Sequence, residues 1–137
     1  MRKLIVIILT LLVAAPVVAQ ETETPWQDAV TGQIQAFRAG DAEAALEFAG
    51  AGFKATYDDA ERFLADIERA GYGPIVSSRS HSFGTFQQFG ETAVIQIVNF
   101  VGPDQSLFEA AYRLADEPGE GWRVQAVVLR EREGIGI

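Results

Sequence analysis

The chain has 137 residues, 48% of them hydrophobic, and its 19 acidic and 11 basic residues give a net charge of −8. It has no cysteine and one histidine, which excludes a thiol nucleophile, a thiolate metal site and a two-histidine zinc motif. Because an acidic protein repels phosphate backbones and anionic lipid, we expect neither nucleic acid nor a membrane surface as a partner.

The first nineteen residues have the layout of a secretory signal peptide. Arg2 and Lys3 give a positive start, and residues 4–18 are apolar apart from one threonine. Small side chains at the end of this run then favour cleavage between Ala19 and Gln20. We therefore expect a periplasmic or secreted protein.

A retained anchor is the alternative to cleavage. Residues 4–18 are fewer than the roughly 20 needed to cross a hydrocarbon core, and no cysteine follows to carry a lipid. We therefore expect no stable membrane anchor and a single mature domain over residues 20–137. Loss of Arg2 and Lys3 leaves this domain nine basic and nineteen acidic residues, a net charge of −10.

The first half of the mature chain is predicted to be helical. Thr24 begins a capping box with Gln27, and Pro25 suits the first helical position. Gly40 ends this helix. Its apolar stripe recurs at helical spacing in Trp26, Val30, Ile34 and Phe37.

Two further helices are expected before the first strand. Asp41 caps a short helix that residues 50–52 end, and Asp58 or Asp59 begins a third helix that the glycines of 71–74 close. The second helix directs Ala45, Leu46 and Ala49 inward, and the third directs Ala60, Phe63, Leu64 and Ile67.

The second half is predicted to form four strands joined by short turns. Their expected ranges are 75–89, 92–101, 107–115 and 122–130, with Gly84 marking a bulge in the first and residues 131–137 frayed. Strands joined by short turns pair antiparallel.

Three helices followed by this meander define an α+β fold. The order of elements resembles the NTF2-like cone, in which N-terminal helices pack on a curved four-stranded antiparallel sheet and leave a pocket between them. A cystatin-like arrangement is the alternative, although it usually has one main helix.

Several segments also resemble a family of small exported, mainly alphaproteobacterial proteins, the domain-of-unknown-function family 4864. The resemblance extends over most of residues 26–130 and implies an exported domain, with no activity or catalytic residue to transfer. The segments are 36–42, Phe63-Leu64 with Gly71-Tyr72, Phe83-Gly84, 101–104, and 121–123 followed by 127–129.

His81 is the residue best suited to proton transfer, because it titrates near neutral pH. In a regular strand it shares a face with Arg79 and Phe83, and this combination suits a small anionic ligand. The alternative is that Arg79 and His81 face water.

Gln96 and Tyr112 are the other candidates for lining a pocket. Gln96 interrupts an apolar strand, so its amide is expected either to find a partner in the core or to line a pocket. Tyr112 lies on a face of its strand that we expect to meet the helices. We expect the same of the matching face of the next strand, formed by Trp122, Val124, Ala126 and Val128.

Three functions remain open. The first two are binding of a small apolar or anionic molecule and protein interaction, including a homodimer through the sheet, because strand 92–101 is apolar on both faces. The third is an acid–base enzyme of the isomerase, cyclase or hydratase kind, with His81 or Asp58 as base and Tyr57 or Tyr112 as hydrogen-bond donor. No metal-ligand or cofactor motif is present, so we expect neither.

Overall fold

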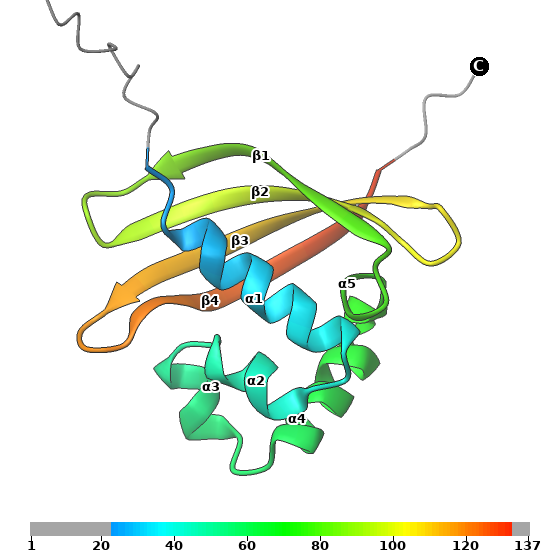
Figure 1. The fold of residues 1–137 in the computed structure, drawn as a ribbon, viewed down its shortest axis with the longest axis horizontal. Helices are drawn as coiled ribbons and strands as arrows, with labels where there is room; N and C mark the ends of the chain where they lie inside the picture. The colour runs from blue at the N-terminus through cyan, green and yellow to red at the C-terminus, as the bar shows by residue number, and fades with distance from the viewer. Residues whose placement is uncertain (1–22, 133–137) are drawn as a thin grey trace, which may run out of the picture.

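The computed structural model describes residues 23–132, in which helices precede a four-stranded antiparallel sheet (Figure 1). The α+β class is therefore confirmed. The predicted signal peptide, residues 1–19, lies outside the described residues. In chain order the elements are α1 (Trp26–Arg38), α2 (Ala42–Glu47), α3 (Ala51–Thr56), α4 (Ala60–Ile67), the π-helical turn η1 (Glu68–Tyr72), α5 (Gly73–Val76), β1 (Ser80–Gln88), β2 (Ala93–Val101), β3 (Leu107–Glu117) and β4 (Gly121–Glu131).

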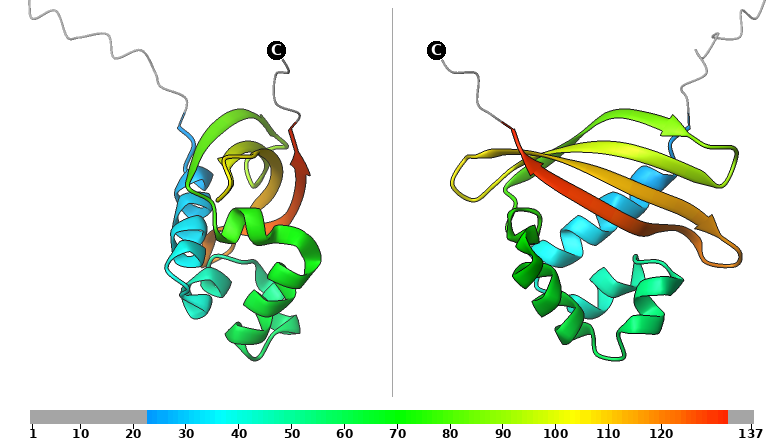
Figure 2. Two further views of the ribbon diagram at one scale, coloured as in Figure 1. Left: turned by 90° about the vertical axis from the view of Figure 1, so that its right-hand side faces the viewer. Right: turned by 180° about the vertical axis from the view of Figure 1, so that it is seen from behind.

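The sheet has the order β1-β2-β3-β4 and stays open. Figure 2 shows it curving, with the helices gathered on one side of it. Residues 48–50 run parallel to β4, where the amide of Gly50 donates to the Val124 carbonyl at 2.8 Å and the amide of Val124 donates to the Phe48 carbonyl at 2.9 Å. This short segment ties the helical layer to the β4 edge.

The apolar stripe of α1 is confirmed, since Trp26, Val30, Ile34 and Phe37 are all buried. The prediction of a capping box was wrong: Pro25 occupies the N-cap position and no side chain caps the helix. The side chain of Gln27 is drawn away from the helix end by a hydrogen bond to Gln96.

The predicted cap of the second helix is confirmed, because the side chain of Asp41 accepts from the amide of Ala44. The expected stop at residues 50–52 is wrong, since Ala51 begins α3. Asp59, one of the two residues expected to begin the third helix, caps α4.

The connection to the sheet is more helical than expected. Gly71 adopts a φ of 99° inside η1, and Pro74 then lies in the first turn of α5, where proline needs no amide partner. The first strand therefore starts at Ser80 rather than at residue 75, and Ile75 and Val76 are buried in helical structure. At the other end β4 continues through Glu131, one residue into the segment expected to be frayed.

Two register shifts decide which side chains face the helices. The shift between Phe83 and Phe86 confirms the bulge expected at Gly84. A second shift, opposite Arg113 and Leu114, was not expected. It separates Trp122 and Val124 from Ala126 and Val128, so the prediction of one continuous face was wrong and Val128 is 67% exposed.

The core lies between the concave face of the sheet and the helices. Its largest fully buried side chains come from α1, α4 and the inner face of the sheet. They are Trp26, Val30, Ile34, Phe63, Val94, Gln96, Val98, Phe100, Tyr112, Leu114 and Val124. Within residues 23–132 no helix has the length and hydropathy that a bilayer crossing requires.

Candidate functional site

An apolar cavity of about 140 Å³ lies between the sheet and the helical layer. Dry cavities of about this size, lined by aliphatic and aromatic side chains, bind benzene. Among the lining residues described here, none is an acid, a histidine, a lysine or an arginine. They are Gln33, Phe37, Ala49, Phe53, Phe63, Ile67, Tyr72, Ile75, Tyr112, Val124 and Val127.

Phe37, Phe53 and Phe63 of the cavity lining belong to an aromatic cluster centred on Phe63, which is buried. Its ring stacks on Phe37 at a centroid distance of 6.2 Å and meets the edges of Phe53 at 5.9 Å and Tyr57 at 5.4 Å. Edge-to-face and offset aromatic pairs at these distances are favourable, so this part of the lining is well defined.

Three lining residues carry polar atoms. Gln33 is only 3% exposed, and its Nε2 donates to the carbonyl of Ala45 at 3.1 Å. The hydroxyl of Tyr72 donates to the carbonyl of Val127 at 2.7 Å. These two hydrogen bonds orient both side chains at the cavity wall.

Tyr112 is the third polar lining residue and is completely buried. Its hydroxyl has no hydrogen-bond partner among the described residues. Burial raises the pKa of Tyr112 far above its usual value, outweighing the opposite effect of Arg38, so the phenol is neutral. A buried hydroxyl without a partner costs about 1–3 kcal/mol. The oxygen is covered by its surroundings, so a ligand reaches it only when neighbouring side chains shift.

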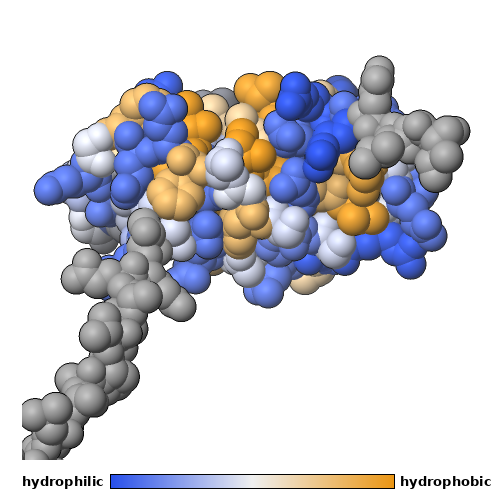
Figure 3. Space-filling model, turned by 90° about the horizontal axis from the view of Figure 1, so that it is seen from above, coloured by the Kyte–Doolittle hydropathy of each residue, from blue (hydrophilic) through white to orange (hydrophobic). Residues whose placement is uncertain are grey.

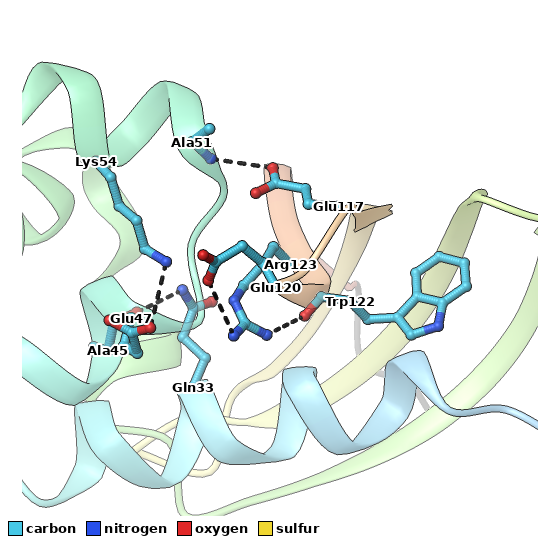
Figure 4. Close-up of polar contacts among 9 residues, drawn as sticks. All are labelled: Gln33, Ala45, Glu47, Ala51, Lys54, Glu117, Glu120, Trp122 and Arg123. Carbon is cyan, nitrogen blue, oxygen red and sulfur yellow. Dashed lines mark hydrogen bonds and ion pairs between the residues drawn. The ribbon is translucent and has the colours of Figure 1, made fainter.

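The start of α3, the helix that carries Phe53 to the cavity, is held to the β3–β4 hairpin by Glu117 (Figure 4). Its Oε2 accepts from the amide of Ala51 at 3.1 Å and from Nε2 of Gln125 at 2.9 Å. The hydrogen bond from Gln125, and then that from Ala51, lower the pKa of Glu117. Lys54, one residue after Phe53, adds an ion pair with Glu47 at 3.6 Å.

Only one of the four predicted pocket residues, Tyr112, lines the cavity. Gln96 is a core amide whose Oε1 accepts from Trp26 and Gln27 and whose Nε2 donates to backbone carbonyls. Arg79 is exposed just before β1.

His81 lies beside α1 rather than in the cavity. Its Nδ1 is 3.1 Å from Nη2 of Arg38, and the same guanidinium donates to the hydroxyl of Ser78. Burial, and to a smaller extent Arg38, lower the pKa of His81. Because arginine can only donate, Nδ1 of His81 is the acceptor in this contact. His81 also borders a separate shallow groove of about 200 Å³ at the sheet surface.

Tyr57 and Asp58 do not form the pair that an isomerase requires. The hydroxyl of Tyr57 donates instead to Oδ2 of Asp66 at 2.9 Å, and this hydrogen bond raises the pKa of Tyr57. Asp58 is exposed. Neither residue lines the cavity. In the described part of the chain no three acidic or histidine side chains cluster as metal ligands would.

Sequence reasoning missed Gln33 and Tyr72 as cavity residues. A signal for Gln33 was present, because it lies one helical turn before Phe37 and therefore on the buried side of α1. Tyr72 gave no comparable signal, because its position depends on the π-turn that precedes α5.

Fold and cavity together define a small α+β domain with an apolar pocket between the sheet and the helices. The chain belongs to the family described as domain of unknown function DUF4864, which it matches over residues 19–137. A solved structure of a protein from Kribbella flavida is similar to it at 13% identity and a TM-score of 0.48, over 80% of this chain and 88% of that one. The search of curated proteins found no match.

Proposed function

We propose that this domain binds a small, uncharged and mostly apolar molecule in the cavity between sheet and helices. The observation that carries the proposal is an apolar cavity of about 140 Å³ lined by aromatic and aliphatic side chains. That volume suits a single ring of about six to nine non-hydrogen atoms.

The chemistry of the lining favours this ligand over an anion. No cationic side chain is among the lining residues, so an anion would lose its hydration without compensation. Gln33 and Tyr112 instead offer a neutral amide and a neutral phenol. A ligand with one hydroxyl or carbonyl oxygen fits such a wall. Once neighbouring side chains shift, it would supply the partner that the Tyr112 hydroxyl lacks.

Binding is also better supported than acid–base catalysis. The titratable side chains of the cavity are Tyr72 and Tyr112, and burial raises the pKa of Tyr112. A general base needs a pKa near the working pH, and the sequence candidates His81 and Asp58 lie outside the cavity.

Two further expectations belong to this proposal. We propose that residues 1–19 are removed on export, so that the domain meets its ligand in the periplasm or outside the cell, and intact-mass analysis of the exported protein tests the cleavage site. We also propose an NTF2-like relationship, supported by helices packed against one side of a curved antiparallel meander.

Titration of the domain with benzene, phenol and indole, followed by two-dimensional NMR of backbone amides, tests ligand binding. We expect saturable shifts at Phe53, Ile67 and Tyr112, strongest with a probe that carries a polar atom. Ile67→Phe fills the cavity from α4 and should weaken binding at least tenfold.

Leu64→Phe is the matched control, because it adds similar bulk to the same helix at a residue outside the cavity lining. It should leave binding unchanged. The proposal is wrong if no probe gives saturable shifts, or if Ile67→Phe binds as tightly as the natural domain.

A further inference from the structure

The sheet face that points away from the helices carries an apolar row across three strands. Ile97 of β2, Ala111 of β3 and Val128 of β4 are directly paired neighbours in the register. Val128 is 67% exposed, and Ile95 beside this row is 36% exposed. Figure 3 looks at the molecule from the sheet side and shows hydrophobic side chains among the hydrophilic ones.

Charged residues border this row on both sides along β3. Glu109 lies two residues before Ala111, and Arg113 lies two residues after it. Glu109 is paired with Arg130 of β4 at 2.8 Å. Arg113 is exposed and takes part in none of the ion pairs found within residues 23–132.

We propose that two copies of this chain pack these faces together, with a two-fold axis along the row Ile97–Ala111–Val128. Such an axis turns β3 antiparallel to its counterpart. It places Ala111 over Ala111 and the exposed Val128 against its equivalent. Glu109 of each copy then faces Arg113 of the other.

Charge complementarity is what selects a second copy as the occupant. Glu109 and Arg113 lie at equal distances on either side of Ala111. A two-fold rotation therefore brings each acidic side chain of one copy opposite a basic side chain of the other, as an isologous interface requires. Each copy contributes the same pair, and the otherwise unpaired Arg113 gains a partner. A strand running parallel to its counterpart would place Arg113 against Arg113.

The size of the face predicts a weak dimer. The four strands, spaced about 4.8 Å apart and counted over about eight residues each at about 3.4 Å per residue, give roughly 500 Å² per copy. Standard stable interfaces bury about 800 Å² per partner. We therefore expect association in the range of about 10–500 μM.

Sedimentation equilibrium of the residue 20–137 domain from 5 μM to 1 mM measures this association. Val128→Asp should raise the dissociation constant at least tenfold. Phe89→Asp is the matched control, because Phe89 is 50% exposed but lies outside the strands, and it should leave the constant unchanged.

A charge-exchange experiment tests the orientation. Glu109→Arg places two cations opposite each other in its own dimer, and Arg113→Glu places two anions there, so each variant alone should be monomeric. An equimolar mixture should dimerise, because both facing pairs then become attractive. Circular dichroism confirms that each variant is folded.

Natural protein that stays monomeric to 1 mM overturns the dimer. A dimer that Val128→Asp leaves intact overturns the assignment to this face. A dimer lost in Val128→Asp but not restored by the mixture overturns the antiparallel arrangement.

Discussion

The indole of Trp26 donates a hydrogen bond of 2.8 Å from Nε1 to Oε1 of Gln96, although 70 positions separate the two residues. Both side chains are fully buried. The same oxygen accepts from Gln27 at 3.0 Å, while Nε2 of Gln96 donates to the carbonyls of Gly84 and Ile97 at 3.1 and 2.8 Å. One carboxamide therefore joins the start of α1 to the bulge of β1.

Replacing this amide should be costly. Gln96→Leu keeps the approximate volume but leaves the Trp26 donor without its partner in the core. We expect a loss of about 2–4 kcal/mol in the free energy of unfolding, measured by urea denaturation. Gln87→Leu, an exposed position on β1, is the control and should change stability by less than about 0.5 kcal/mol. A loss below about 1 kcal/mol for Gln96→Leu would contradict the role given to this hydrogen-bond network.

The two predicted helix caps should differ in energy. Asp41 accepts a hydrogen bond from the amide of Ala44 at 3.1 Å, so Asp41→Ala should cost about 1 kcal/mol. Thr24 makes no side-chain cap, so Thr24→Ala should have an effect of no more than a few tenths of a kcal/mol. Thermal and urea unfolding of the two variants separate these cases, and equal losses would contradict the difference between the caps.

The features of the fold that depend on local residue spacing were predicted correctly from the sequence. The stripe of α1, the cap of α2, the bulge at Gly84 and the order of the four strands follow from neighbouring residues alone. The capping box predicted at Thr24 was wrong because the side chain of Gln27 donates instead to Gln96, 69 positions along the chain. Tertiary contacts of that kind leave no local pattern.

The cavity was harder to predict than the fold. Tyr112 was identified because its strand alternates, but Phe53 and Tyr72 reach the cavity through α3 and η1, and neither element was expected. A register shift in β4 likewise turns Val127 toward the helices, whereas the sequence predicted that Ala126 and Val128 would face them. A single inserted residue reverses every later side chain in a strand, and alternation in the sequence does not reveal where it occurs.

The single histidine should make stability depend on pH. Burial and Arg38 lower the pKa of His81 below its usual 6.5, so the unfolded chain binds the proton more tightly than the folded one. Stability should therefore rise with pH up to about 6.5 and be lost as the pH falls from 6.5 through the folded-state pKa. His81→Gln should flatten this part of the profile, measured by urea unfolding between pH 5 and 7.5.

Two measurements check the cause. An NMR titration of the His81 ring should give a pKa below 6.5, and Arg38→Ala should raise it by removing a nearby cation. A pKa at or above 6.5 in the natural protein would show that the imidazole is better solvated than its place beside Arg38 and Phe83 implies.

We expect substitution of Gly32, in the middle of α1, by alanine to destabilise the protein, although alanine is the best helix former. A Cβ atom there would lie 2.7 Å from Cε1 of Phe48, whose ring packs over this turn of the helix. Glycine to alanine in a helix normally gains about 1 kcal/mol, whereas overpacking costs about 1–3 kcal/mol. Gly32→Ala should therefore lower the free energy of unfolding by about 1 kcal/mol in urea denaturation.

The sign should reverse once the ring is removed. In a Phe48→Ala background the added methyl meets open space, so Gly32→Ala should stabilise by about 0.5–1 kcal/mol. The four proteins of this double-mutant cycle, compared by urea midpoint at equal slope, give the coupling between the two positions directly. If Gly32→Ala stabilises the natural protein as much as the Phe48→Ala variant, the ring does not limit the size of residue 32, and α1 can shift away from Phe48 at little energetic cost.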